Sequence, residues 1–463
     1  MSASVRRFPL AAVAVLVALI LLLTTGCPLA PPGPPPPTAP DYSILVLDAR
    51  NSWAHGINEH GEVVGRVEVG YRDWNACVWR PFGTPKFTDL GSLGGISATA
   101  YAINNSHQVA GSSSTGGEPP WTRAFLWTQG GEMQQLGTLG GNTGNAWDIN
   151  NKGEVVGQAA HSNGYLYAFV WDADNGTRVV PGAGIGSDAY GIHNASAIVG
   201  KEGGGDNWAT KPPSGRRWSG ANDVFDIPNT LGGQAVRARD INISGTIVGI
   251  AGVSATKYVA FKWTPPGPMK NLGSLGYCNN SGFCSEAVAV NTHGNAVGLA
   301  ASADKGQTNA VLWHGDQIYD LNDLLPSNHQ WGRLFEANDI NDKGSIVGSG
   351  LRLGPQGAYE AAFVMLRGVL TSIITPSDPI ITGTWSPEVE FSEDAPFDLE
   401  IDLELSDLNG AARLLEDTVV VRAGQRRATF DIQVEAITGT RTGRISASFG
   451  GKTITAPFTV RDF

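Results

Sequence analysis

The sequence predicts an all-β protein in which a seven-bladed β-propeller is followed by a β-sandwich. Three observations lead to this prediction. Segments related to Ile57–Gly65 recur seven times between residues 41 and 370, with starts 43 to 50 residues apart. The chain of 463 residues contains 60 Gly and only 16% charged residues, which suits short strands joined by tight turns. After residue 370 the repeat stops and evenly spaced strand patterns follow.

Composition also excludes some classes of function. The formal net charge is −11, which argues against a general nucleic-acid binder, because such a protein needs a basic surface for the phosphates. Four Cys in so long a chain exclude a small disulfide framework. None of the common catalytic or phosphate-binding motifs is present, and the 8 His have no metal-ligand spacing. We therefore expect no cofactor and no metal.

The N-terminus has the pattern of a targeting segment. Arg6 and Arg7 precede an apolar run from Leu10 to Leu23, which is shorter than the ~20 residues of a membrane-spanning helix. The run ends at Gly26 and Cys27, and this junction resembles a bacterial lipobox, although Thr24 stands where that motif usually has Leu. We expect a lipoprotein signal peptide at 1–26, lipidation of Cys27, and a proline-rich extended tether at 27–40. An ordinary secretory signal or an uncleaved anchor is the alternative.

The repeats occupy residues 41–370 and contain three linked segments. The first is the Ile-Asn segment, and its starts are separated by 46, 46, 43, 49, 49 and 50 residues. The second has the form Ala-Phe-x-Trp, as at Ala168–Trp171, and the third has the form Leu-Gly-x-Leu-Gly, as at Asp89–Gly95. Each unit of ~45 residues reads as four short strands, which is the size of a propeller blade. Asn and Gly in the Ile-Asn segment suit a tight hairpin turn.

The ends of the repeat region match each other. Tyr42–Leu47 aligns with the Leu-Gly strand, and no such strand follows the seventh Ala-Phe segment. We therefore expect the N-terminal strand to complete the last blade and close the ring. A linear β-solenoid is the alternative architecture.

The three motifs resemble those of the HAF family of extracellular repeat proteins. The resemblance covers about 330 residues and implies an extracellular compartment and the repeat architecture, but no assigned activity. The fourth copy departs from the pattern, with His193 in place of Asn and Ser196 in place of the turn Gly. His107 replaces that Gly in the second copy. We expect looser hairpins in these two copies.

The C-terminal residues 371–463 form a separate predicted domain with a net charge of −7, from 15 acidic and 8 basic residues. Asp398–Leu405 alternates acidic and apolar residues, as expected for a strand with one buried face. The stretches Val419–Gly424, Ala428–Val434 and Ile445–Gly451 are similar to bacterial immunoglobulin-like modules. We expect a β-sandwich of that type.

Acidic residues and tryptophans are the candidates for ligand sites. Two sets of residues could hold Ca²⁺: the pairs of the repeated Asp-Ile-Asn, at Asp148/Asn150, Asp240/Asn242 and Asp339/Asn341, and the acidic row from Asp398 to Glu404. We favour turn capping for the first set and a solvated face for the second. The motif tryptophans are expected to pack between blades. Ligand-binding aromatics are expected instead in the loops, at Trp121, Trp208, Tyr277 and Phe283, while Trp147 is one of several further aromatics placed near turns.

The cysteines fit an oxidising compartment. Cys278 and Cys284 flank a Gly-containing loop and are expected to form a disulfide, and Cys77 is expected to be a buried free thiol. Together these features predict a non-enzymatic scaffold, anchored to the membrane of the cell envelope through its lipid, that binds protein or glycan through propeller loops. The alternative is a propeller hydrolase or lyase acting on polysaccharide, which would need paired carboxyl groups near the propeller axis.

Overall fold

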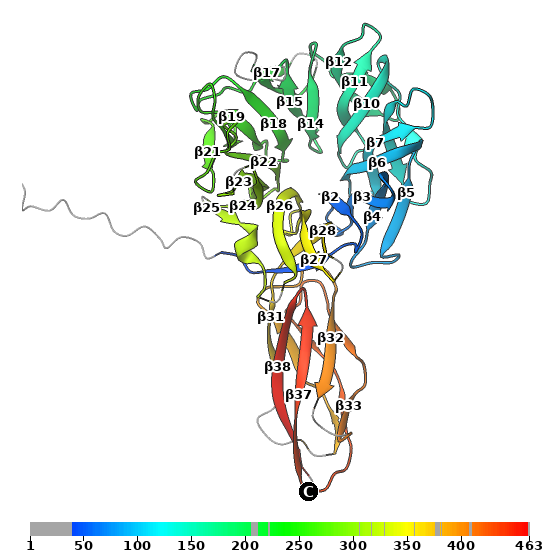
Figure 1. Cartoon of the computed structure of the whole chain (residues 1–463), viewed down its shortest axis with the longest axis vertical. Coiled ribbons are helices and arrows are strands. Elements are labelled where there is room, and N and C mark those ends of the chain that lie inside the picture. The colour runs from blue at the N-terminus through cyan, green and yellow to red at the C-terminus, as the bar shows by residue number, and fades with distance from the viewer. Residues whose placement is uncertain are drawn as a thin grey trace, which may run out of the picture. The chain divides into compact units, whose positions relative to one another are not determined.

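The structure is a computed structural model in which strands follow one another from residue 42 to residue 461 (Figure 1). It describes residues 39–204, 212–220, 223–304, 306–315, 317–327, 329–355, 357–375, 380, 382–406 and 410–461. The described residues contain many strands and one short 3-10 helix, η1 (Leu321–Leu324), which confirms the all-β prediction.

Each repeat in the chain contributes its strands in sequence order. The strands of the first three repeats are β2 (Ser52–Ile57), β3 (Val63–Gly70), β4 (Asp73–Trp79), β5 (Phe87–Gly91), β6 (Gly94–Ile103), β7 (Gln108–Thr115), β8 (Thr122–Thr128), β9 (Gln134–Gln135), β10 (Gly140–Ile149), β11 (Val155–His161), β12 (Leu166–Asp172) and β13 (Gly176–Val179). Those of the last four are β14 (Asp188–Ile192), β15 (Ile198–Glu202), β16 (Ser214–Trp218), β17 (Val224–Asp226), β18 (Val236–Ile241), β19 (Ile247–Gly252), β20 (Tyr258–Trp263), β21 (Lys270–Gly273), β22 (Ser285–Val290), β23 (Ala296–Ala301), β24 (Thr308–His314), β25 (Gln317–Asp320), β26 (Trp331–Ile340), β27 (Ile346–Gly354) and β28 (Gly357–Arg367).

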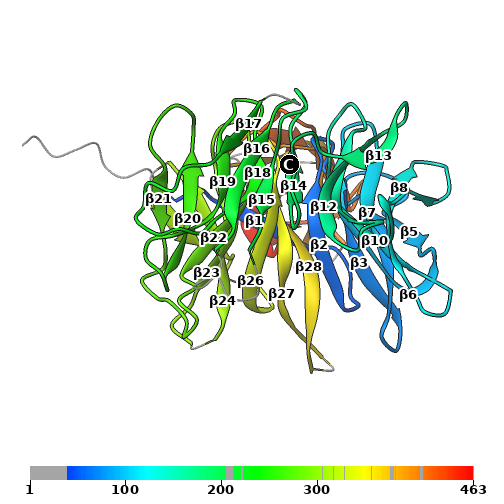
Figure 2. The ribbon, with the colours of Figure 1, turned by 90° about the horizontal axis from the view of Figure 1, so that it is seen from above.

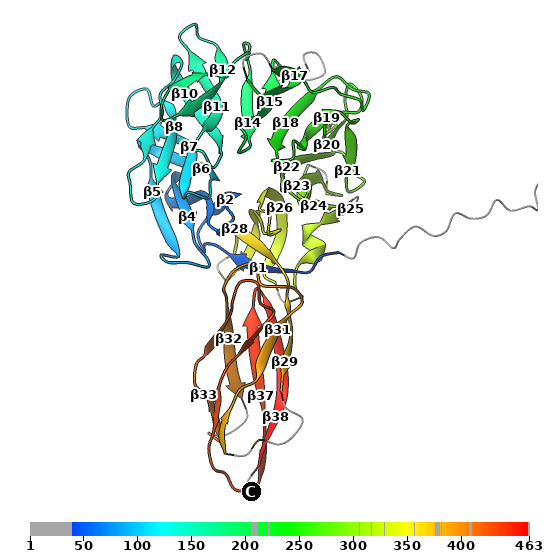
Figure 3. The same ribbon diagram turned by 180° about the vertical axis from the view of Figure 1, so that it is seen from behind.

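These strands pair antiparallel within each repeat, in the order of the chain. The first two repeats join into one eight-stranded sheet through a single parallel bridge between Trp74 and Ser97. The seventh repeat has three strands of its own, and β1 (Tyr42–Val46) pairs antiparallel with β28 as the fourth (Figure 3). The pairing predicted for the N-terminal strand is therefore observed.

The turn in each Ile-Asn segment is held by its asparagine side chain. In the first repeat, Oδ1 of Asn58 accepts hydrogen bonds from the backbone N–H groups of His60 and Glu62, both at 3.0 Å. Gly61 takes the positive φ of 76° that this turn requires. The asparagine thus caps its own hairpin, as the sequence predicts.

The same asparagine also joins its sheet to the next one. Nδ2 of Asn58 donates to the backbone carbonyl of Asn104 at 3.1 Å, and Asn341 in the last repeat donates back to the carbonyl of Asn58 at 3.1 Å. The other equivalent bonds run from Asn104 to Asn150, Asn150 to His193, Asn242 to Asn291 and Asn291 to Asn341. Among the described residues this bond is not repeated from His193 to Asn242, because an imidazole stands in place of the amide.

The two turns that lack glycine keep its backbone conformation. His107 and Ser196 have φ values of 60° and 65°. Nδ1 of His107 lies 2.6 Å from Oε2 of Glu62, and Oγ of Ser196 donates to Glu154 at 2.5 Å, so each side chain reaches the preceding repeat. Burial would raise the pKa of Glu62, but hydrogen bonds from His107, Asn58 and Arg80 outweigh burial and lower this pKa. These hairpins are held by contacts between sheets and are not the looser turns we expected.

Apolar residues fill the spaces between successive sheets. Six clusters of buried side chains each lie between one repeat and the next. A further cluster joins the last repeat to the first, with Val347 and Ala362 beside Val63 and Trp79. The first strands of successive repeats contact one another, and β26 contacts β2, so the contacts return to their starting point. Figure 2 shows β28 of the last repeat beside β2 of the first.

The C-terminal strands form three antiparallel sheets. They are β29 (Leu370–Ile374), β30 (Gly383–Trp385), β31 (Glu388–Phe391), β32 (Leu399–Ser406), β33 (Ala412–Leu414), β34 (Thr418–Val421), β35 (Arg427–Thr429), β36 (Ile432–Val434), β37 (Thr440–Phe449) and β38 (Lys452–Arg461). In β32 the residues Leu399, Ile401 and Leu403 are buried, while the acidic residues between them are exposed. This confirms the predicted solvated face, since the carboxyl groups point away from the core.

The C-terminal strands also pack against the repeats. Their apolar residues belong to the same cluster as those of the first and last repeats. Phe397 stacks on Phe82 with ring centroids 4.6 Å apart, and Nζ of Lys343 lies 4.2 Å from the centroid of Phe397. Arg367 forms a salt bridge of 3.0 Å with Glu393. The two regions therefore share one hydrophobic core at this junction.

Candidate functional site

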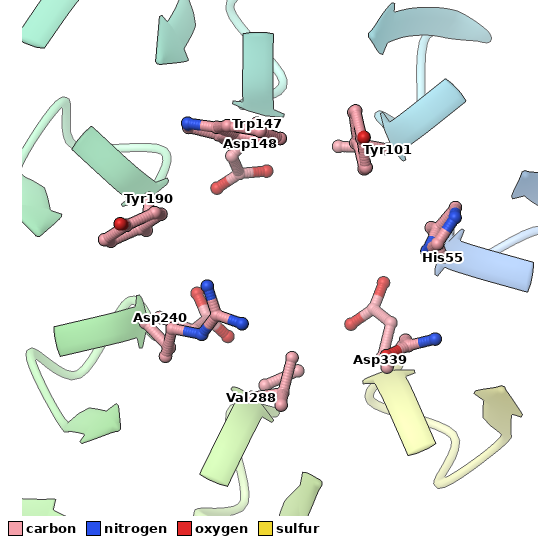
Figure 4. Close-up of a pocket in the computed structure, with 12 residues that line it drawn as sticks. His55, Tyr101, Trp147, Asp148, Tyr190, Asp240, Val288 and Asp339 are labelled. Atoms are coloured by element: carbon pink, nitrogen blue, oxygen red, sulfur yellow. The ribbon is translucent and has the colours of Figure 1, made fainter. Parts of the chain in front are cut away.

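A cavity of about 350 Å³ lies among the first strands of the repeats (Figure 4). Every repeat contributes to its lining the residue that stands two positions before the Ile or Val of the Ile-Asn segment. These residues are His55, Tyr101, Trp147, Tyr190, Arg239, Val288 and Asn338. The position before it is Ala in all seven copies, whereas this position differs between nearly all copies. Its variation distinguishes it from the packing positions, which are small or aliphatic in every copy.

Four of these lining residues form an aromatic arc. His55 and Tyr101 have ring centroids 5.2 Å apart, and Tyr101 meets Trp147 edge to face at 4.9 Å. Trp147 is followed by Tyr190 at 6.5 Å, and the guanidinium carbon of Arg239 lies 5.2 Å from the centroid of Tyr190. Aromatic faces beside a few polar groups are typical of sites for small organic ligands.

Three carboxyl groups line the same cavity, from the third, fifth and seventh repeats. They belong to Asp148, Asp240 and Asp339, and Figure 4 shows those of Asp148 and Asp339 directed into the central space. The equivalent residue in the other repeats is small, as at Gly191, where a Cβ would lie 3.3 Å from Oδ1 of Asp240. The small residues thus leave room for the carboxyl groups beside them.

Each of these carboxyl groups bridges two sheets. Oδ2 of Asp148 accepts the N–H of Ile192 at 2.7 Å, Oδ2 of Asp240 that of Val290 at 2.8 Å, and Oδ2 of Asp339 that of Ile57 at 2.8 Å. The other oxygen accepts the N–H of the next residue in its own chain segment. Turn capping is predicted for the Asp-Ile-Asn pairs, and their asparagines do cap the turns. The aspartates differ from the prediction, because they join the sheets around the cavity.

The three carboxyl groups have raised pKa values. Burial raises the pKa of Asp240 to about 6. Burial and the charge of Asp240 raise the pKa of Asp148 to about 7. Burial, followed by the charges of Asp240 and Asp148, raises the pKa of Asp339 to about 8, against the lowering effect of its hydrogen bond from Ile57. Protonated and ionised carboxyl groups therefore coexist in this cavity near neutral pH.

A polar network on the same strands supports the lining residues. Nε1 of Trp147 donates to Asp188 at 2.8 Å, which fixes the orientation of the indole ring. Glu286 binds Arg237 at 2.7 Å and Arg239 at 2.9 Å. Burial would raise the pKa of Glu286, but these two guanidinium groups outweigh burial and lower this pKa. The side chain of Arg239 is thus held beside the cavity by a buried carboxylate.

The predicted loop residues lie outside this cavity. Trp121 follows the tip of the β7–β8 connection, and Tyr277 and Phe283 lie in the β21–β22 connection, where Tyr277 is 48% exposed. Trp208 and Cys27 fall outside the described residues. Trp147, which we placed near a turn, lies within β10 and lines the cavity. Sequence reasoning missed the cavity-lining position, which stands two residues before the Ile or Val of the Ile-Asn segment and carries a different side chain in nearly all copies.

The cysteines and motif tryptophans lie where we predicted them. Cys278 and Cys284 form a disulfide, and Cys77 is a buried free thiol whose pKa is raised by burial. Trp79, Trp127, Trp263 and Trp313 are buried between sheets, and Trp171 is partly buried there. These rings therefore belong to the core and not to a binding surface.

The described residues contain neither a metal-binding cluster nor a membrane-spanning helix. No group of three or more His, Cys, Asp or Glu residues in that part of the chain is arranged to hold a metal ion. No helix found there is long and apolar enough to cross a membrane.

Comparisons with known proteins add the family. No curated protein matches the chain. Among solved structures, a Salmonella alpha-2-macroglobulin reacted with methylamine is 9% identical with a TM-score of 0.15, and a trypsin-activated alpha-2-macroglobulin from Escherichia coli is 10% identical with a TM-score of 0.15. They cover 91% and 92% of this chain, which spans only 31% and 40% of theirs, and at these scores the likeness carries no argument. A family model matches residues 134–371, about half of the chain, and the protein accordingly belongs to the family described as "Protein of unknown function (DUF3466)".

Proposed function

We propose that residues 41–370 form a seven-bladed β-propeller of HAF-type repeats, followed by an immunoglobulin-like β-sandwich. The support is that the connections between repeats form a closed cycle. Apolar clusters and first-strand contacts join each repeat to the next, asparagine bonds join all neighbours except the fourth and fifth, and all three connect the last repeat to the first. A linear solenoid has no reason to join its ends in this way. In a propeller, the first strand of each blade lies nearest the axis, which makes the cavity an axial site.

The protein is exported and anchored to the cell envelope through a lipid on Cys27. The charged and apolar pattern before Gly26 and Cys27 supports this proposal. The disulfide between Cys278 and Cys284 agrees with an oxidising compartment. Metabolic labelling with a palmitate analogue should mark the wild type and leave Cys27→Ser unlabelled, and equal labelling of both would contradict the anchor.

The propeller is a binding protein whose axial cavity holds the end of a glycan. The observation that carries this proposal is the ring of seven variable side chains, one from each repeat, around a cavity of about 350 Å³. Aromatic rings stack on the apolar faces of sugars, and carboxyl, amide and guanidinium groups bind hydroxyl groups. The cavity replaces the loops as the proposed site, because aromatic and polar side chains from different repeats converge on it.

A glycan array probed with residues 39–463 tests the binding role. Tyr101→Ala should weaken binding of any glycan found by about tenfold or more, since a stacked ring is lost from the arc. Trp121→Ala is the matched control, because it removes an aromatic ring outside the cavity. If Trp121→Ala weakens binding and Tyr101→Ala does not, the site lies in the loops.

A second candidate is a hydrolase or lyase acting on polysaccharide. The specific observation in its favour is the convergence of three carboxyl groups on one cavity, with pKa values of about 6, 7 and 8, since a protonated acid and an ionised base are both present near neutral pH. The inter-sheet hydrogen bonds that occupy these carboxyl groups favour the binding role. Polysaccharide turnover by the wild type that is abolished in Asp339→Asn would establish the enzymatic role instead.

A further inference from the structure

We infer that the axial cavity receives a positively charged organic group, and that its ligand is an amino sugar with a free, protonated amine. This inference rests on the proposed function, from which the sugar ring is taken. It assigns to the cavity a class of ligand selected by charge.

The charges that line the cavity are unbalanced. Asp148, Asp240 and Asp339 provide three carboxyl groups, and the one guanidinium among the described lining residues, on Arg239, is already paired with Glu286. His55 adds no positive charge near pH 7, because burial, and then the charge of Arg66, lower its pKa to about 3. A cation placed among these carboxyl groups would be attracted by those that are ionised, and it would favour ionisation of the others.

The aromatic arc also suits a cation. A protonated amine within ~6 Å of a ring centroid is attracted to the face of Trp or Tyr, more strongly where water is excluded. Tyr101, Trp147 and Tyr190 provide three such rings around the central space, on the strands next to those that carry the carboxyl groups or on the same strand (Figure 4). The cavity volume of about 350 Å³ is within the ~300–1,000 Å³ range of small-molecule sites.

A buried nitrogen of the lining gives independent support. Nε2 of His55 is buried and has no hydrogen-bond partner among the described residues. The ring is neutral near pH 7, and one of its tautomers presents this nitrogen as an acceptor. An ammonium group has three N–H donors and no acceptor, so it complements the neutral imidazole as well as the carboxylates.

Binding of a cation must be linked to protons. The titratable or charged groups that face the cavity are His55 on β2, Tyr101 on β6, Asp148 on β10, Tyr190 on β14, Arg239 and Asp240 on β18, and Asp339 on β26. Further along these strands and β22 lie Asp188, Arg237, Glu286 and Glu336. The three lining aspartates of the first group have pKa values near neutrality. A bound cation favours their ionised form, so protons leave the protein when it binds.

Isothermal titration of the full-length chain tests the inference with three probes. They are the β-1,4-linked glucosamine disaccharide, its N-acetylated form, and choline, which is a cation without a sugar ring. We expect the amine disaccharide to bind at least about tenfold more tightly than the N-acetylated form, because only the amine can pair with a carboxylate. Titrations at pH 7 in two buffers of different ionisation enthalpy should show proton release with the amine and none with the N-acetylated form.

Two variants test whether binding and proton release take place in the cavity. Asp339→Asn should weaken binding of the amine disaccharide by about tenfold and reduce proton release. Asp398→Asn removes the same charge from the exposed face of the C-terminal region and should change neither measurement. The proton release of the wild type remains a test if Asp339→Asn fails to fold.

The outcomes separate this inference from the proposed function. Equal binding of the two disaccharides without proton release overturns the inference and leaves glycan binding in place. Binding of choline alone supports a cation site and contradicts the glycan role. If none of the three probes binds at millimolar concentration, the inference is wrong.

Discussion

The three lining aspartates are subject to opposing forces. Backbone N–H groups of two sheets donate to each carboxyl group, which favours the ionised form, while burial and the neighbouring aspartates favour the protonated form. The second effect is the larger, so the pKa of each is raised. Because the folded protein holds these protons more tightly than the unfolded chain, the contribution of each aspartate to stability is complete below about pH 4 and is lost as the pH rises through the folded pKa.

Asp339 should therefore make stability depend on pH between about 4 and 8. Its pKa rises from 3.8 in the reference state to about 8 in the fold. In Asp339→Asn the difference between the unfolding temperatures at pH 5 and pH 8 should shrink by about 2 °C or more relative to wild type. Calorimetry of both proteins measures this difference. An unchanged difference would show that Asp339 is ionised throughout, and Asp398→Asn serves as the control.

At the scale of the element, one asparagine organises both the hairpin and its neighbour. The Oδ1 atom of Asn291 accepts the N–H of Asn295 at 3.0 Å, and its Nδ2 atom donates to the carbonyl of Asn341 at 3.1 Å. His193 keeps only the first function, since its Nδ1 accepts the N–H of Ala195 at 2.9 Å. Among the described residues, the turn of the fourth repeat therefore lacks the side-chain bond to the following turn.

His193→Asn should restore the missing hydrogen bond. The new amide can donate to the carbonyl of Asn242, and a hydrogen bond of this kind contributes about 1 kcal/mol to the free energy of unfolding. Chemical denaturation should show a stabilisation of that order. The reverse exchange, Asn291→His, removes an existing bond and should destabilise the protein by a similar amount. Equal stability of all three proteins would mean that these bonds only replace bonds to water.

The N-terminal strand should be required for a stable fold. Tyr42 and Ile44 in β1 are buried, and Oη of Tyr42 donates to the carbonyl of Gly344 at 3.3 Å. A chain that begins at Asn51 loses this strand and leaves the edge of β28 unpaired, which favours aggregation. Light scattering and thermal unfolding should show aggregation and a large loss of stability relative to a chain that begins at Ala39. Identical behaviour of the two chains would show that β1 does not contribute to closure.

At the scale of the whole molecule, the repeats and the C-terminal strands share a core. Phe397 lies between Phe82 and Lys343 in the cluster that also joins the first and last repeats. We therefore expect the region from residue 39 to 461 to unfold in a single calorimetric transition. Phe397→Ala removes ~3 kcal/mol or more of packing at the junction and should split this transition into two. A single transition in the variant would place the coupling elsewhere, and Phe225→Ala, at an exposed ring, is the control.

The sequence predicted the parts of this fold that repeat. Asn58, Gly61 and the Ala-Phe-x-Trp segments recur in most copies with the same structural role, so their recurrence reveals turns and core strands. The non-repeating stretch Ala428–Val434 is divided between β35 and β36, which belong to different sheets, because Phe430 turns into the core between them. The candidate site could not be found by recurrence, since its side chains differ from one copy to the next. Aromatic and charged residues at one position of an otherwise aliphatic segment were the available signal.

The number of repeats is odd, and this limits how the lining aspartates can alternate around the ring. Aspartate at every second repeat cannot close around seven positions, and two neighbours must both lack it. These neighbours carry Gly56 and Ala102, beside His55 and Tyr101. The ring therefore has a single uncharged sector opposite the acidic one, although its backbone repeats seven times. A ligand with one polar and one apolar end would have a single preferred orientation, so the parity of the repeat breaks the rotational symmetry that the fold would otherwise impose.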